Sequence, residues 1–216
     1  MNSLIQTISV YAIPVLFAIT LHEAAHGYVA RMFGDNTAEQ EGRITLNPIP
    51  HIDPIGTIAL PLFLLFSSKL LGGAGILFGW AKPVPVNWSR LRNPKRDMLW
   101  VALAGPGANL FMAIIWAISL RLLIELGSSP TDFTVLMAIA GINVNLVLMA
   151  LNLLPLPPLD GGRIVFSLLP PSLAYPYSRI EPYGMVILIL LLVTGSLWMF
   201  LSPILFLGQK VIGWFL

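Results

Sequence analysis

The sequence has 216 residues, of which 56% are hydrophobic and only 10% are charged, and its mean hydropathy is +0.82. A soluble domain carries about 25% charged residues, so this composition excludes an ordinary water-soluble protein. The formal net charge is +2 and there is no cysteine. The basic residues stand beside apolar segments, which favours membrane orientation over nucleic-acid binding, and disulfides and thiolate metal sites are excluded.

The apolar segments predict an all-α polytopic membrane protein with about four spanning helices, since about 20 helical residues cross a hydrocarbon core. The first helix is predicted at 3–33. We interpret it as a retained helix and not a signal peptide, because no basic segment precedes its apolar run. The polar stretch 40–56 contains alternating residues from Arg43 to Leu46 and then three prolines. It predicts a small β-hairpin, followed by an irregular turn.

The next apolar stretch, 57–80, is interrupted by Lys69 and by two glycines. Each half is too short to span, which favours a re-entrant hairpin, and a full span is the alternative. Further membrane helices are predicted at 98–126, 133–154 and 183–207. Residues 1–216 are interpreted as a single membrane-embedded domain.

The orientation follows from a basic loop. Four basic residues lie between Arg90 and Arg96, which predicts that this loop is cytoplasmic. The helix 98–126 then leads outward and 133–154 returns, so that Asp160 is expected on the cytoplasmic side of a multi-pass protein of the cell membrane.

Two histidines, His22 and His26, stand four residues apart in the first predicted helix, with Glu23 between them. On a helix this spacing places both imidazoles on one face, one turn apart, where they can bind one zinc ion. Glu23 can then take a proton from the attacking water. Ionisable residues inside a membrane helix are costly, which favours a functional site over a chance match.

A zinc site of this kind needs a third protein ligand. Without cysteine, the candidates are a carboxylate or His51, and the carboxylates outside clearly polar surroundings are Asp53 and Asp160. Asp160 follows the apolar stretch 153–159, where an unpaired carboxylate would be costly. This position favours Asp160 as the ligand; the alternative is that Asp160 only caps a helix that begins at Gly161.

Two motifs carry a resemblance to a known family: residues 22–27, His-Glu-Ala-Ala-His-Gly, and residues 152–161, Asn-Leu-Leu-Pro-Leu-Pro-Pro-Leu-Asp-Gly. Residues 42–48, 51–56 and 105–109 fit it too. In this order and spacing the sequence resembles the site-2 protease family of intramembrane zinc metalloproteases, peptidase family M50, in a short bacterial-type form without PDZ or CBS domains.

The resemblance implies one Zn²⁺ per chain, with His22, His26 and Asp160 as ligands and Glu23 as general base. It also implies a site sunk below the cytoplasmic surface, in the inner membrane of a bacterium. The expected activity is zinc-dependent hydrolysis of peptide bonds within or near transmembrane segments of membrane proteins, that is, regulated intramembrane proteolysis.

The roles of the other polar residues are less defined by the sequence. Peptide hydrolysis forms a tetrahedral oxyanion, which needs a hydrogen-bond donor besides zinc. Asn152 is the first candidate for this donor and His51 is the second. The alternative role of Asn152 is an interhelical hydrogen bond. Arg43 and His51 are predicted to contact substrate. Asn109 is expected to be a packing contact and Asn145 a helix–helix hydrogen-bonding residue.

Two rival functions can be compared with the protease. A transporter of metal ions or protons should carry polar residues through several helices, whereas here they gather at two points. A catalytically inactive relative should have lost one of the four motif residues, and all four are present. The expected partners are a transmembrane protein or peptide substrate and the lipid bilayer, with no nucleic acid; the oligomeric state is left open.

Overall fold

The computed structural model describes residues 2–59, 79 and 81–216. These residues are helical or irregular, and none of them forms a strand. Three helices are long and apolar enough to cross a membrane, judged by length and composition: residues Ile5–Met32 of α1 (Asn2–Met32), α4 (Pro94–Glu125) and α5 (Phe133–Asn152). The predicted all-helical membrane protein is confirmed.

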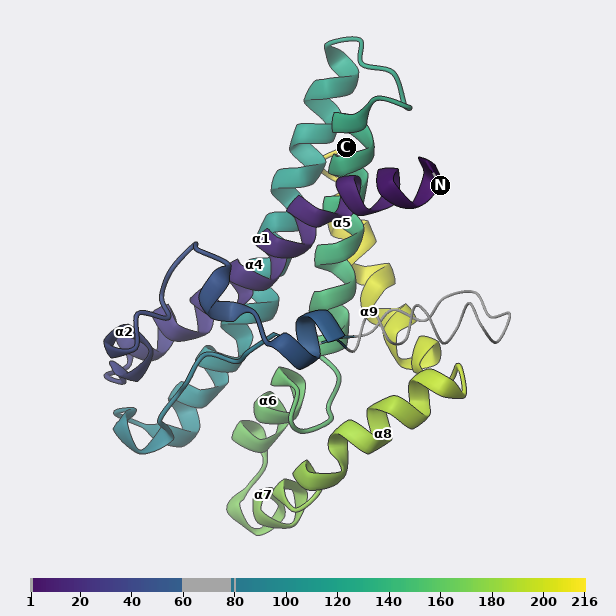
Figure 1. Ribbon diagram of the computed structural model, residues 1–216. Coiled ribbons are helices and arrows are strands. Elements are labelled where there is room, and N and C mark those ends of the chain that lie inside the picture. The colour runs from purple at the N-terminus through teal and green to yellow at the C-terminus, as the bar shows by residue number, and fades with distance from the viewer. Residues whose placement is uncertain (1, 60–78, 80) are drawn as a thin grey trace.

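The three long helices form the frame of the molecule. Figure 1 shows α4 and α5 as two antiparallel helices joined by residues 126–132, with α1 crossing them obliquely, and α1 packs against both. Small residues allow the close approach of α4 and α5: a Cβ on Gly141 would lie 2.4 Å from ring atoms of Trp116. Packing through small residues is the usual way in which membrane helices associate.

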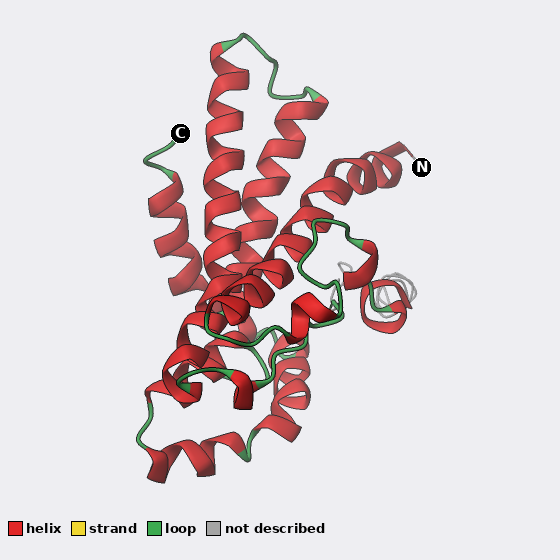
Figure 2. Ribbon diagram, turned by 90° about the vertical axis from the view of Figure 1, so that its left-hand side faces the viewer, coloured by secondary structure: helices red, strands yellow, loops and turns green. Residues whose placement is uncertain are grey.

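A shorter apolar helix, α9 (Leu197–Ile212), completes the hydrophobic core. It packs along α5, and Figure 2 shows it beside the α4–α5 pair. Ala113 of α4, Leu146 of α5 and Leu201 of α9 belong to one buried cluster. The main hydrophobic core therefore lies on the side of α5 that faces α9. Helix α1 packs against α4 and α5 separately from this core.

The C-terminal region differs from the prediction of one helix at 183–207, which is wrong. Helix α8 (Glu181–Val193) ends before Gly195, whose φ is +73°, and α9 then begins in a new direction. Such a φ suits glycine and interrupts a right-handed helix. Helix α7 (Pro171–Ser178) and α8 make an angle of 63°, and if this bent pair is one span the described residues hold four candidate spans.

The predicted β-hairpin in 40–56 is also wrong. The described residues there form the short helix α2 (Thr37–Gln40), turns and bends over 41–47, a 3-10 turn (Ile49–His51) and a π-helical turn (Pro54–Ala59). Local side chains take the backbone groups that a strand ladder would use: Asn47 N donates to Thr45 Oγ1, and Ile49 N donates to Asn47 Oδ1. Such bonds compete with sheet pairing. The predicted re-entrant segment 57–80 falls outside the described residues except at its ends.

Helix α6 (Asp160–Leu168) follows a proline-rich loop and packs against α4. The loop folds back tightly, because a Cβ on Gly161 would lie 2.2 Å from the carbonyl oxygen of Leu154. Only glycine fits such a close approach to backbone. This fold-back places Asp160 at the first residue of α6, next to the long helices.

Candidate metal centre

The metal-binding candidates begin with the two histidines of α1. His22 and His26 are buried, each 7% exposed, and lie on adjacent turns of the helix. Their Nε2 atoms are 3.1 Å apart. The i, i+4 spacing thus directs both rings to one point, as the helical periodicity predicts.

Asp160 reaches the same point from α6. Its Oδ2 atom lies 3.2 Å from Nε2 of His22 and 3.2 Å from Nε2 of His26. The carboxylate is 6% exposed. The structure therefore brings together a carboxylate from α6 and two imidazoles from α1, which are far apart in the chain.

The second nitrogen of each ring defines its tautomer. His22 Nδ1 lies 2.6 Å from Oδ1 of Asn109, and His26 Nδ1 lies 2.7 Å from the carbonyl oxygen of Val101. Both of these oxygens can only accept, so each Nδ1 carries the hydrogen and donates. Each neutral ring then presents an Nε2 lone pair to the other ring and to Asp160.

This arrangement fits a zinc ion. Three lone-pair atoms face one another at 3.1–3.2 Å without a hydrogen between them, and Asp160 Oδ2 receives no hydrogen bond from the described residues. Zinc–nitrogen and zinc–oxygen bonds of about 2.0–2.2 Å in a tetrahedron separate neighbouring ligand atoms by about 3.3–3.6 Å. The observed spacing lies just below the short end of this range, and a cation would remove the repulsion between the lone pairs. Among the described residues these three are the group that could hold a metal ion.

Helix α4 closes the site at a glycine. A Cβ on Gly105 would lie 2.4 Å from His26 Nε2 and 2.5 Å from His22 Cε1. Any side chain at this position would therefore occupy the space of the two rings. In the sequence, Gly105 was noted only as part of segment 105–109, which fits the family resemblance. The close approach of Gly105 to the rings of His22 and His26 appears only in the fold.

Asn109 belongs to a buried hydrogen-bond chain, and not simply to a packing contact as the sequence suggested. Its amide donates to Asn145 Oδ1 at 3.0 Å and to the carbonyl oxygen of Ala18 at 3.2 Å, while Asn145 donates to the carbonyl oxygen of Gly141 at 2.8 Å. Both asparagines are fully buried. The chain thus runs from His22 on α1 through α4 to α5, and it orients the Asn109 oxygen towards the ring.

Glu23 is half-buried and lies on α1 between the two histidines. Its Oε2 accepts a hydrogen bond of 2.8 Å from the backbone N–H of Val84. Nothing in the sequence predicted this bond between Val84 and Glu23. A backbone donor leaves no distinctive side-chain signal in a sequence.

His51 and Arg43 lie in the irregular region next to this bond. His51 is 1% exposed; its Nε2 lies 3.3 Å from the carbonyl oxygen of Thr45, and its Nδ1 has no hydrogen-bond partner among the described residues. Burial lowers the pKa of His51, so the ring is neutral near pH 7. Arg43 is 6% exposed and donates to the carbonyl oxygens of Lys82 and Pro83.

Two other sequence candidates have local partners. The Asn152 amide donates to the carbonyl oxygen of Leu148 in its own helix at 3.1 Å. The Asp53 carboxylate accepts the backbone N–H groups of Ile55 and Gly56 at 3.0 and 2.6 Å. Asp53 therefore caps the π-helical turn and does not join the metal-binding group.

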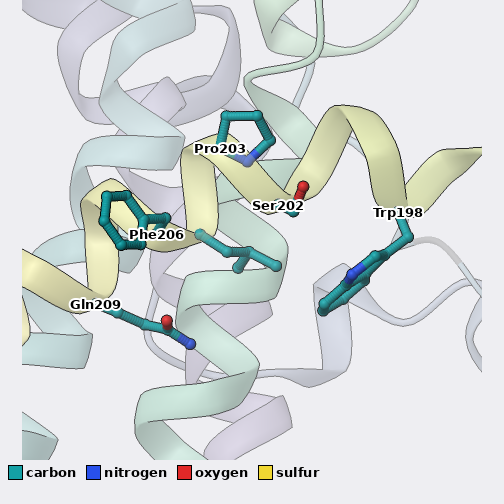
Figure 3. A pocket seen from close by; sticks show the side chains of 6 residues that line it. Trp198, Ser202, Pro203, Phe206 and Gln209 are labelled. Atoms are coloured by element: carbon teal, nitrogen blue, oxygen red, sulfur yellow. The ribbon is translucent and has the colours of Figure 1, made fainter.

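A cavity of about 450 Å³ lies elsewhere, along α9. Figure 3 shows its lining, which includes Trp198, Ser202 and Phe206, all from that one helix. None of its described lining residues is titratable, so it adds nothing to the metal centre.

Comparisons with known proteins agree with this geometry. Peptidase family M50 matches residues 125–195, which include Asp160. YwhC of Bacillus subtilis (strain 168), named as a zinc metalloprotease, is 41% identical over 187 residues, covering 84% of this chain and 79% of YwhC. Rip2 of Mycolicibacterium smegmatis, also named as a zinc metalloprotease, is 31% identical over 188 residues, covering 86% of this chain and 68% of Rip2. No solved structure matches this chain.

The apolar helices, the His-His-Asp group and these relatives define a class: a multi-pass membrane zinc metalloprotease. More particularly, the chain belongs to peptidase family M50, the site-2 protease family. The resemblance seen in the sequence, the enzyme class and the zinc cofactor are thereby confirmed.

Proposed function

We propose that the protein is an intramembrane endopeptidase, which hydrolyses peptide bonds within or near transmembrane segments of membrane proteins. The observation that carries this proposal is the position of buried His22 and His26 and half-buried Glu23 on a helix that is itself a candidate membrane span. A proteolytic centre on such a helix is placed to act on bonds at membrane depth. The lipid bilayer and a transmembrane substrate are then its partners.

In this proposal His22, His26 and Asp160 hold the zinc ion and 1–216 acts as one membrane-embedded domain. When bound, zinc supplies Lewis-acid chemistry, because it polarises a carbonyl group and makes water more acidic. The Glu23 carboxylate accepts the proton of the attacking water and returns it to the leaving amine. The burial of these groups limits competition from bulk water and strengthens their electrostatic interactions.

The oxyanion and the substrate backbone need further partners. Asn152 remains the proposed donor to the oxyanion, since its amide is bonded only within its own helix and a change of rotamer would free it. His51 suits a different role, because its Nε2 faces a carbonyl oxygen and its Nδ1 therefore offers an acceptor. We therefore assign His51 to a substrate N–H group.

The proposed orientation puts the metal centre towards the cytoplasm. Arg90 and Arg92 precede α4, and Lys95 and Arg96 lie in its first turn. Lys95 donates to the carbonyl oxygen of Leu169, which follows α6. The basic loop and the Asp160 helix therefore lie at the same end of the bundle. Basic loops remain cytoplasmic in multi-pass proteins.

The test is a cleavage assay with detergent-purified protein and a single-span membrane peptide. Cleavage is expected to require zinc, to stop with a chelator and to be lost in Glu23→Gln, which should still contain zinc. A soluble peptide of matched composition serves as the comparison substrate. Equal cleavage of both peptides would contradict an intramembrane specificity, and undiminished cleavage by Glu23→Gln would remove the assignment of the general base.

A further inference from the structure

A short extended segment crosses the face of α1 that carries Glu23. We call this segment, residues 82–86, the strap. Its sequence is Lys-Pro-Val-Pro-Val, and it has no regular secondary structure. Val84 lies at its centre and is 7% exposed. The side chain of Val84 faces α1, because a Cβ on Gly27 would lie 3.1 Å from Val84 Cγ1. Gly27 is one helical turn beyond Glu23, so the strap rests on the helix beside the proposed general base.

The strap presents a single backbone donor at this point. Proline has no N–H, so in the sequence Pro83-Val84-Pro85 only Val84 can donate, and its N–H is bonded to Glu23 Oε2 at 2.8 Å. Pro85 also disfavours helical conformations of the preceding residue, Val84, and so favours an extended backbone there. The direction of this one N–H is thus largely predetermined by the sequence of the strap.

Three further bonds hold the strap in place. Lys82 N donates to the carbonyl oxygen of His51 at 3.0 Å. A terminal nitrogen of Arg43 donates to the carbonyl oxygens of Lys82 and Pro83, at 2.8 and 3.2 Å. Arg43 is buried, and within the described structure its charge is paired with no carboxylate. A buried arginine used only to hold two backbone carbonyls indicates that the position of these carbonyls matters.

We propose that Arg43 and the strap position the carboxylate of Glu23 for proton transfer; this inference rests on the proposed function. The N–H of Val84 selects one orientation of a side chain that otherwise rotates about several bonds. Oε1 accepts no hydrogen bond from the described residues and can accept one from water. Outer-shell hydrogen bonds of this kind orient catalytic and metal-binding groups. Arg43 acts through the strap and is a positioning residue in this proposal, a different role from the substrate contact that the sequence predicted.

The decisive variant is Val84→Pro, which removes the N–H bonded to Glu23 in a strap that is already extended and proline-rich, together with the Val84 side chain. The turnover rate kcat on the membrane peptide is expected to fall by about 10- to 100-fold, while KM and zinc content stay within about twofold of the wild type. Val84→Ala keeps the N–H and shows how much of the loss comes from the side chain. Its kcat is expected to remain clearly above that of Val84→Pro.

A second set of variants tests Arg43. It keeps the inference testable even if Val84→Pro does not fold. Arg43→Met is expected to lower kcat with unchanged zinc content, and Arg43→Lys should recover part of the loss because an ammonium group can still donate to one carbonyl. The matched control is Arg31→Met, since Arg31 is exposed and paired with Glu39; its kcat should equal that of the wild type.

The outcomes separate this inference from the proposed function. Equal kcat values for Val84→Pro and Val84→Ala would overturn it, and so would a loss of activity that follows a loss of zinc or of thermal stability. A loss confined to kcat supports it. If the wild type fails to cleave, or Glu23→Gln cleaves normally, the proposed function itself is overturned and this inference with it.

Discussion

Nδ1 of His22 donates a 2.6 Å hydrogen bond to Oδ1 of Asn109 across the α1–α4 interface. The bond selects the tautomer whose Nε2 lone pair faces Asp160, and Asn145 holds the Asn109 amide in the required orientation. The geometry of a candidate metal-binding imidazole in this protein therefore depends on two fully buried amides from two other helices.

Replacement of Asn109 should weaken zinc binding. Asn109→Leu has similar volume but no acceptor, so the His22 ring loses its partner and its preferred tautomer. We expect the zinc Kd to rise by about 10- to 100-fold, as measured by competition with a chelator of known affinity. Asn109→Asp keeps an acceptor for His22 and should bind zinc more tightly than Asn109→Leu. Equal affinities of these two variants would exclude a role for the acceptor.

Asp160→Ala tests the proposed third ligand. With only two imidazoles left, the purified variant should contain little zinc by elemental analysis. Asp53→Ala is the matched control, because the sequence left Asp53 as an alternative ligand whereas the fold uses it to cap a turn. The control is expected to keep its zinc. Full zinc content in Asp160→Ala would rule out the ligand assignment.

Gly105→Ala should disturb the metal centre by volume alone. The added methyl group would fall 2.4 Å from His26 Nε2 and 2.6 Å from His22 Nε2, so the rings must move apart. We expect a loss of zinc affinity of more than about 10-fold. Gly107→Ala, in the same helix, meets no described atom within 4 Å and should bind zinc normally. A tight-binding Gly105→Ala variant would mean that α4 can shift away at little cost.

Zinc removal should lower the thermal stability of the protein. A ligand at 100 times its Kd stabilises the folded state by about 2.7 kcal/mol, and here it also joins α1 to α6 through His22, His26 and Asp160. The melting temperature in detergent should therefore fall on chelation and recover when zinc is added. In Asp160→Ala the melting temperature should respond weakly to zinc. A large zinc response in that variant would point to a different stabilising site.

Much of the fold could be predicted because the length and apolar composition of a membrane helix are properties of one continuous segment. The apolar stretches 98–126 and 133–154 agree closely with α4 and α5. The two wrong predictions of secondary structure lie where a local backbone conformation or local hydrogen bonds override the apolar or alternating pattern. Gly195 divides the predicted helix at 183–207, and side-chain bonds around Asn47 replace the predicted hairpin.

The relationship of His22 to His26 was determined by the sequence alone, since residues four apart share a helix face whatever surrounds them. The apolar stretch before Asp160 favoured it as the third ligand, and the family resemblance implied the same ligand. The tertiary structure alone decided that Asn109, Gly105 and Val84 meet this group, because a hydrogen-bond partner, a missing Cβ and a backbone N–H act through contacts between distant segments and leave no periodic pattern in the chain.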